Sequence, residues 1–451
     1  MASEKQYLSL YEQQKALICA GSCAPMNNRR EEAAALLTAK GLPTAKTERY
    51  KYTDVEAAFA PDFGLNLKRI PLKIDPYETY RCTVEHLGAW NYYVVNDTVA
   101  PASHESAALP QGIIVDSLVN VAAKRPELLE KFYHQAAGRS YDGVTTLNTL
   151  LAQDGLLIYI PSGVEAAQAV QIVNVSASTI DFMSNRRVLI VLEENAKATV
   201  LFCDHALEGR HYLTTEVVEV FAEQGATLDI YAVEETDFVN TRFCNVYIEQ
   251  ASKSKVTYCG MTLHNGVSRN TVNVRLNGEQ AEVNTYGAVV ADGKERVDNN
   301  LLIDHVGEGC TSDMLYKYVL DDNAVGAFAG KVLVESGAQH TQSQQTNDNL
   351  CVSQHARAFA QPMLEIYADD VKCNHGSTVG KLDANALFYM QQRGVPEKEA
   401  SLLLQHAFIN DVLQRIKMET LRDRLSYLIE QRFRGNSIHC KGCRMVDYCR
   451  K

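Results

Sequence analysis

From Gly155 to Lys372 the sequence consists of short extended segments separated by small or polar residues. The segments are rich in Val, Ile, Thr and Tyr, the residues that favour strands. The early breaks recur about every 27 residues, a period typical of stacked β-coils. This regularity constrains the fold more than any other feature. It favours a β-solenoid, with an antiparallel β-sandwich as the alternative. The breaks centre near Ala196, Gly225, Ala251, Gly278, Ala324, Gly337 and Ala356.

Helical patterns precede the strand-rich segment. Residues 4–20 carry apolar side chains at helical spacing and end before Gly21. Asn28 is a suitable cap for a second helix, which we expect to run to Gly41. A helical insertion is also expected over residues 117–137, before the turn at Asp154–Gly155 that leads into the strand LLIYI.

Helical patterns also follow the strand-rich segment. Asp383 is a suitable cap for a helix that ends at Gly394, and Pro396 begins the next helix. An apolar stripe then predicts packing against a core. These helices also carry basic residues of the kind that is usually exposed, which form either a solvated face or a docking face for a partner: Arg415, Lys417, Arg422, Arg424, Arg432 and Arg434. We therefore expect a mainly β protein with helical ends, divided into residues 1–76 (helical), 77–154 (mixed α/β), 155–375 (parallel coils), 376–435 (helical) and 436–451 (cysteine-rich tail).

Composition narrows the class of protein. The net charge of -11 argues against a general nucleic-acid binder, which carries a basic face. The first residues do not have the basic and then apolar pattern of a signal peptide, and no apolar run approaches the roughly 20 residues of a membrane span. Twelve cysteines without an export signal indicate free thiols in a reducing compartment. We expect a cytoplasmic protein.

Cys373 and His375 are the first candidate site, where the strands give way to helices. In an extended segment residues i and i+2 face the same side, so a thiol and an imidazole would lie together. Such a pair suits a soft or borderline metal. A tetrahedral site takes four ligands, so the others must come from elsewhere in the chain, from a partner or from a transferred cofactor.

The tail SIHCKGCRMVDYCRK is the second candidate site. It contains four soft ligands within eleven positions, and it could hold Zn or Fe. The adjacent histidine and first cysteine make joint ligation awkward, and a redox-labile tail is the alternative. The four residues are His439, Cys440, Cys443 and Cys449.

Other chemistry is poorly supported. Gly326 to Lys331 is one residue short of a phosphate loop and lacks its Ser or Thr. No G-x-S-x-G elbow is present. Asp369 and Asp370 could suggest an enzyme that cleaves polysaccharide, but neighbouring strand residues face opposite ways. The single tryptophan, Trp90, also lies outside the coils. Two alternatives stay open: a β-helix enzyme acting on polysaccharide, and a self-sufficient metalloprotein that uses the tail.

The segment around Cys373 and His375 resembles the C-terminal signature of the SufB/SufD family of iron–sulfur cluster assembly proteins. It reads LEIYADDVKCNHGSTVGKLDANALFYMQQRGVPEKEASLLLQHAFINDVL. PTAKTERYKYTDV at 43–55 resembles the family's N-terminal motif, with Tyr50 where Trp is common. LNTLLAQDGLLIYIPSGV at 147–164 and QTNDNLCVS at 345–353 are also similar to family segments. The run Cys373-Asn374-His375 resembles the SufD branch, because the SufB branch has an acidic Glu-His-Glu run there.

The resemblance implies a right-handed parallel β-helix core and a non-catalytic scaffold role. Family members of the two branches pair through their cores, and each binds one copy of the ATPase SufC through its C-terminal helices. His375 matches a histidine proposed to bind a nascent iron–sulfur cluster at the SufB–SufD interface, and Cys373 matches the cysteine beside it. The helices expected to dock SufC include Pro396, Leu403, Phe408, Val412 and Ile416. The resemblance leaves open whether the chain also forms a homodimer in isolation, and it does not account for the tail.

Overall fold

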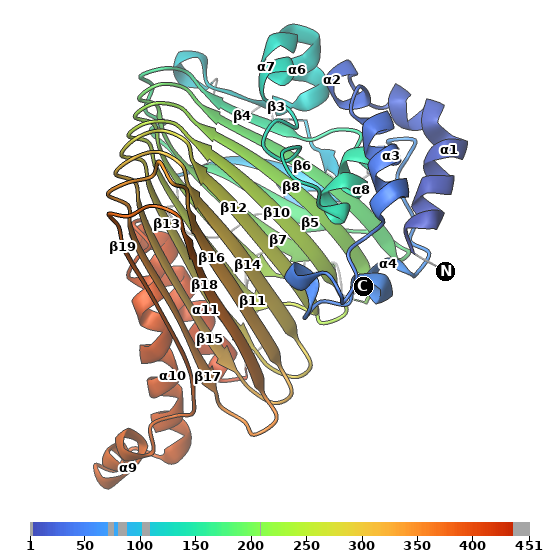
Figure 1. Cartoon of the computed structure of the whole chain (residues 1–451). Helices are drawn as coiled ribbons and strands as arrows, with labels where there is room; N and C mark the ends of the chain where they lie inside the picture. Colours follow the sequence, from blue (N-terminus) through green and yellow to red (C-terminus); the bar gives the residue numbers. More distant parts are fainter. Residues whose placement is uncertain (1–2, 71–75, 80–87, 102–108, 208, 436–451) are drawn as a thin grey trace.

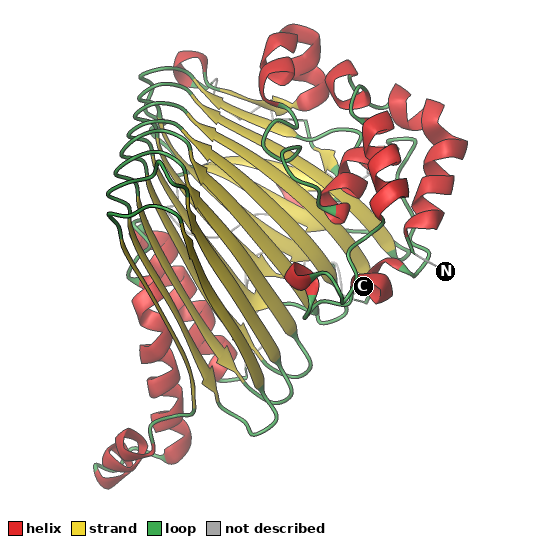
Figure 2. Ribbon diagram, viewed as in Figure 1, coloured by secondary structure: helices red, strands yellow, loops and turns green. Residues whose placement is uncertain are grey.

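Two parallel sheets form the body of the molecule (Figures 1 and 2). The computed structural model describes residues 3–70, 76–79, 88–101, 109–207 and 209–435. In spatial order, sheet A contains β3 (Ile114–Ser117), β4 (Leu156–Ile160), β6 (Phe182–Leu192), β8 (Tyr212–Ala222), β10 (Thr241–Gln250), β12 (Val267–Leu276), β14 (Arg296–His305), β16 (Val325–Val334) and β18 (Arg357–Ile366). Sheet B contains β2 (Thr98–Val99), β1 (Trp90–Val95), β5 (Val170–Ser176), β7 (Lys197–Ala206), β9 (Thr227–Glu235), β11 (Lys255–His264), β13 (Glu282–Ala291), β15 (Thr311–Leu320), β17 (Gln342–Cys351) and β19 (Lys372–Gly380).

From β4 to β19, consecutive strands alternate between the two sheets, so two strands make one coil of a β-solenoid. Thr241 pairs with Val267, Val267 with Arg296, and Arg296 with Val325, so these three coils take 26, 29 and 29 residues. These pairs are all parallel. The predicted β-solenoid is therefore confirmed, and the antiparallel sandwich is wrong.

The breaks predicted from the sequence are the corners of the coils. At the corner that leads from sheet A to sheet B, one residue in each of six coils has a positive φ: Asn195, Gly225, Lys253, Gln280, Gly309 and His340. Backbone hydrogen bonds join each corner to the next, as from Gly225 N to Ser252 O at 3.0 Å. Glycine adopts this conformation without strain, whereas Lys253 at φ 61° accepts it because the stacked corners fix the backbone.

The interior between the sheets is apolar over most of its length. Alternate residues of each strand face inward, and stacked Val, Ile and Leu side chains such as Val188, Val218, Val246 and Val272 form a continuous core. One row along this interior is charged. Arg242 lies 2.8 Å from Glu216 and 3.2 Å from Asp204, and Arg186 lies 2.7 Å from Asp204. All four side chains are buried, so each charge depends on its partners.

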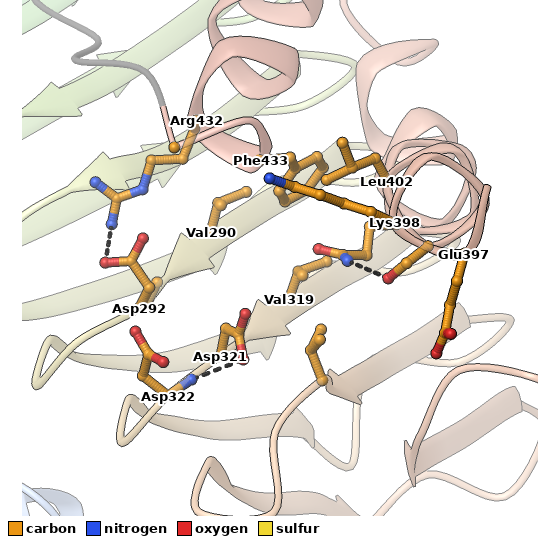
Figure 3. A pocket seen from close by; sticks show the side chains of 15 residues that line it. Val290, Asp292, Val319, Asp321, Asp322, Glu397, Lys398, Leu402, Arg432 and Phe433 are labelled. Carbon is orange, nitrogen blue, oxygen red and sulfur yellow. Dashed lines mark hydrogen bonds and ion pairs between the residues drawn. The ribbon is translucent and has the colours of Figure 1, made fainter.

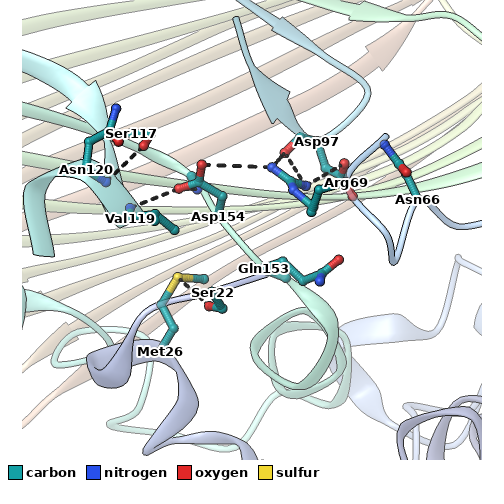
Figure 4. A network of polar contacts seen from close by, with 12 residues as sticks. Ser22, Met26, Asn66, Arg69, Asp97, Ser117, Val119, Asn120, Gln153 and Asp154 are labelled. Atoms are coloured by element: carbon teal, nitrogen blue, oxygen red, sulfur yellow. Dashed lines mark hydrogen bonds and ion pairs between the residues drawn. The ribbon is translucent and has the colours of Figure 1, made fainter. Parts of the chain in front are cut away.

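Short antiparallel strands terminate the first coils. β3 pairs antiparallel with β4, and β2 pairs antiparallel with β1, whose other edge joins β5. We call this the closed end. Arg69 ties it together, because its guanidinium lies 3.0 Å from Asp97 and 3.9 Å from Asp154 (Figure 4). Asp154 also accepts the N–H of Val119.

The N-terminal helices cover the outer face of sheet A near the closed end (Figure 1). The first helix has the predicted bounds. The second begins at Arg30 rather than at an Asn28 cap, and Arg30 donates to the carbonyls of Leu150 and Ala152. The insertion predicted over 117–137 breaks at Arg125 into two helices. The elements are α1 (Glu4–Ala20), α2 (Ala24–Asn27), α3 (Arg30–Lys40), η1 (Glu48–Tyr50), α4 (Val55–Phe59), α5 (Pro76–Thr79), η2 (Pro110–Gly112), α6 (Leu118–Lys124), α7 (Pro126–Phe132) and α8 (Gly143–Leu151).

A strap formed by residues 43–59 crosses sheet A from these helices toward the last coils. Arg49 donates to Asn273 and Asn300, each at 2.8 Å, and Thr53 donates to Asp298. Tyr52 stacks on Phe359 of β18 with ring centroids 4.6 Å apart. The strap therefore links the N-terminal helices to the final coil.

The C-terminal helices are α9 (Ala384–Gln392), α10 (Glu397–Leu413) and α11 (Glu419–Phe433). The side chain of Asp383 caps α9 as predicted. Helices α10 and α11 pack on the outer face of sheet B through Ile409, Val412, Leu425 and Ile429. Within the described ranges, no helix is long and apolar enough to cross a membrane.

Candidate functional site

The last coil of the solenoid has a free edge on both sheets. β18 ends sheet A and β19 ends sheet B, and among the described residues no strand pairs with their outer edges. We call this the open end. Apolar side chains are exposed there, including Ile366, Tyr367 and Val379. A long, exposed edge with apolar side chains is a surface suited to pairing with another chain.

Cys373 and His375 lie on β19, at this edge. Cys373 pairs in register with Ser343 of β17, and His375 pairs with Gln345. Ser343 and Gln345 are buried and face the solenoid interior. Stacked residues of a parallel sheet share a face, so Cys373 and His375 both stand over the interior, as the i, i+2 spacing predicts.

The two side chains differ in exposure. Cys373 is partly buried against an apolar cluster that includes Val332 and Val334, whereas His375 is exposed. Burial raises the pKa of the Cys373 thiol above its ordinary value, and a hydrogen bond from the Ser343 backbone opposes that rise. The thiol is thus held mostly protonated until a metal or another cation stabilises its thiolate.

A polar floor, formed by Ser343, Gln345, Asn347 and Asn349 of β17, lies beneath this part of β19. All four side chains are buried, and Gln345, Asn347 and Asn349 stack in register on Met314, Tyr316 and Tyr318 of the preceding coil. Asn349 donates to Asn347 at 2.8 Å and to the Thr378 carbonyl at 2.9 Å. His305 continues the polar interior through Ser312, which donates to Ser343 at 2.8 Å. This floor was not predicted from the sequence. Its signal in the sequence is the presence of amide side chains at alternate positions of one strand, namely Gln345, Asn347 and Asn349.

The donor set suits iron but does not complete a site. A thiolate and an imidazole are ligands for iron and for iron–sulfur clusters. No group of three or more His, Cys, Asp or Glu residues capable of holding a metal occurs in the described part of the chain. Cys373 and His375 therefore fit half of a site. The tail ligands His439, Cys440, Cys443 and Cys449 lie outside the described residues. The cysteines that the structure describes are free thiols.

The predicted docking residues have different surroundings. Pro396 is the N-cap of α10, and Leu403 is 47% exposed. Phe408 is partly covered, and the Lys317 ammonium lies 4.8 Å from its ring centroid. Val412 and Ile416 are buried against sheet B, so they can support a docking surface but do not reach a partner directly.

Helix α9 adds an exposed apolar surface that sequence reasoning missed. It stands clear of the sheets (Figure 1), and none of its residues is buried. Phe388 and Tyr389 are 61% and 58% exposed. An aromatic pair in a helix is more often part of a core, so only the structure reveals this surface.

A cleft of about 640 Å³ separates the C-terminal helices from the ends of β13 and β15 (Figure 3). Asp292, Asp321 and Asp322 line one side, and Glu397 and Lys398 line the other. Arg432 was expected to be exposed, and that expectation is wrong. Its guanidinium is buried 2.6 Å from Glu295 and 3.0 Å from Asp292, so it fastens the end of α11 to a coil corner.

Comparison with known proteins agrees with this architecture. Residues 174–408 match the family model described as SUF system FeS cluster assembly, SufBD core domain, and residues 1–172 match the SufBD protein N-terminal region. A SufBD family iron–sulfur cluster assembly protein of Synechocystis is 26% identical over 95% of both chains. Iron–sulfur cluster assembly protein SufD of Bacillus subtilis is 27% identical over 75% of this chain and 78% of its own length. The SufD protein of Escherichia coli is 25% identical over 88% of this chain and 90% of its own. Since the core model alone spans more than half of the 451 residues, the chain belongs to the SufBD family of iron–sulfur cluster assembly proteins.

Proposed function

We propose that this chain is a non-catalytic, SufD-type scaffold subunit that pairs with a SufB-type chain through its open end. Family membership supports a role in iron–sulfur cluster assembly. The observation that carries the proposal is the free edge of β18 and β19, with Cys373 and His375 beside it. Pairing would cover the exposed Ile366 and Val379 and add strands to both sheets.

The cluster is the cargo of this scaffold. Cys373 and His375 supply two ligands for it, and the SufB-type chain supplies the others. The polar floor beneath them consists of neutral side chains, so it places no fixed charge beside a cluster and supplies no permanent metal ligand. A half site of this kind favours transient binding, because the cluster loses ligands when the two chains separate.

We further propose that helices α9 to α11 dock a SufC-type ATPase. Phe388, Tyr389 and Leu403 supply exposed apolar surface for such a contact. The helices are also firmly attached to the solenoid through Arg432 and through the ion pair between Lys317 and Asp411. Movement of a docked ATPase would therefore be transmitted to the coils rather than absorbed by the helices.

The experiment is co-purification with SufB-type and SufC-type chains, followed by anaerobic loading with iron and sulfide. We expect the double variant Cys373→Ala/His375→Ala to keep the complex intact and to lose most of the cluster absorbance. Thr378→Ala, an exposed change on the same strand, is the matched control. Unchanged cluster yield and iron content in the double variant would refute the assignment of the site.

The alternatives receive less support. Asp370 lies 3.0 Å from His340, so Asp369 and Asp370 are not supported as a polysaccharide-cleaving pair. A metal site at the tail stays a prediction. Metal analysis of a chain truncated after Gly435 separates it from the main proposal, since loss of all bound metal would indicate the tail.

A further inference from the structure

Gln345 is held rigidly in the polar floor. Its side chain is 0% exposed, and its Nε2 donates to the carbonyl of Gly330 at 3.1 Å. Gly330 makes this position possible, because a Cβ there would lie 2.2 Å from the Gln345 nitrogen. The side-chain nitrogen of Gln345 therefore bonds to a strand of sheet A, and this bond fixes the orientation of the amide.

The second polar atom of this side chain is its carbonyl oxygen. Gln345 Oε1 is buried and has no hydrogen-bond partner among the residues that the structure describes. The register neighbour below it is Met314, which has no N–H or O–H in its side chain, and the neighbour above it is His375. A buried acceptor without a partner is unfavourable, so the oxygen needs a donor from the last coil.

The imidazole of His375 is the donor that lies in register. In its neutral form it has one N–H and one lone pair, and a histidine that binds a metal usually directs its N–H to a fixed acceptor. His375 is exposed, so its ring can turn toward Gln345 without displacing a packed neighbour. We propose that Gln345 is a positioning residue that accepts the N–H of His375 and leaves the second ring nitrogen free to face the partner chain.

The purpose of this hydrogen bond rests on the proposed function, because Gln345 would select the tautomer in which His375 can bind the cluster. The hydrogen bond itself is a property of the isolated chain. It can therefore be tested without a cluster, a partner or turnover.

The first measurement is the tautomer of His375 in the full chain labelled with ¹⁵N-histidine, with its signal assigned by comparison with His375→Gln. We expect one tautomer in the unmodified chain, and a mixture in Gln345→Met, which keeps the length of the side chain and removes the acceptor. Gln344→Met is the control, because Gln344 is exposed on the opposite face of the same strand. An unchanged tautomer in a folded Gln345→Met protein would overturn the inference.

The second measurement is iron retained by the complex with a SufB-type and a SufC-type chain. We expect Gln345→Met to lower the affinity for iron by about 10- to 100-fold, the usual effect of removing a partner of a ligating histidine. If His375→Ala loses no cluster, the proposed function fails while the tautomer result can still stand. If the tautomer does not respond to Gln345→Met, the inference fails even when the proposed function holds.

Discussion

The two ends of the solenoid differ in how their outermost strand edges are treated. Any stack of coils leaves unpaired backbone groups on its first and last strands, which invite association. At the closed end β2 and β3 are short and antiparallel, and Arg69 fastens the segments around them. At the open end β18 and β19 are nine or ten residues long and keep free outer edges. Among the described residues, the difference leaves free strand edges at the open end, where the proposed pairing would occur.

The polar groups inside the solenoid also differ between the two ends. Near the closed end, the polar groups are charged and neutralise one another, as Arg186, Asp204, Glu216 and Arg242 do. Near the open end, they are neutral amides and hydroxyls, and Gln345 keeps an unused acceptor. Charges that compensate one another resist any change in their surroundings, whereas neutral groups can exchange partners at low cost. The charged interior near the closed end therefore resists rearrangement, whereas the neutral interior near the open end is compatible with the transient binding proposed above.

The largest effect should come from breaking the charged row. Burial opposes the charge of Arg242, but Asp204, Glu216 and Glu234 more than compensate and raise its pKa well above the ordinary value. Arg242→Met leaves these carboxylates buried with less compensation, so we expect a loss of about 3–5 kcal/mol in the free energy of unfolding. Chemical denaturation measures this loss.

Lys372→Met, at an exposed position of β19, is the control for that experiment, and we expect it to change the same free energy by less than about 0.5 kcal/mol. Equal losses from the two variants would remove the distinction between the ends.

A smaller effect should appear in the pH dependence of stability. Burial lowers the pKa of His305 to about 4, so the folded protein resists a proton that the unfolded chain accepts near pH 6.5. Stability should therefore fall as the pH drops from about 6.5 to 4, and this one group accounts for up to about 3 kcal/mol of the loss. His305→Gln should lose less stability than the unmodified chain over this range, as measured by denaturant titration at each pH.

The exposed His355 provides the matched change for that comparison. His355→Gln should follow the unmodified chain at every pH. If the stability of His305→Gln falls with pH as steeply as that of the unmodified chain, the polar interior near the open end is more hydrated than its burial indicates.

Local sequence signals predicted the elements well where the decisive contacts are also local. The turn at Asp154–Gly155 leads directly into β4, and α1 ends before Gly21. Periodic breaks predicted the coils because each coil repeats the contacts of the last one. The pairing of β1 with β5 was not predicted, since it joins segments some 80 residues apart in sequence, with helices between them.

The candidate site was predicted only in part, for the same reason. The i, i+2 spacing places Cys373 and His375 on one face without knowledge of any neighbour. The burial of Arg432 depends on Glu295, which lies 137 positions earlier, and a basic residue in a last helical turn is normally exposed. Likewise, the apolar spacing that includes Val412 and Ile416 cannot distinguish packing on sheet B from docking to a partner. The structure places Val412 and Ile416 against sheet B and leaves Leu403 exposed, which the spacing alone could not show.

The smallest effect on stability, and the most direct test of the two ends, comes from adding one charge to each. Val379 at the open end and Ile180 in the first coil are both 56% exposed. Val379→Lys and Ile180→Lys should each change the free energy of unfolding by less than about 0.5 kcal/mol, since both side chains are more than half exposed. A lysine on an edge strand opposes pairing with another strand. Size-exclusion chromatography with light scattering should therefore show that Val379→Lys weakens assembly with a SufB-type chain and that Ile180→Lys does not. Equal assembly by both variants would mean that the free edge of the last coil is not the surface on which the partner binds.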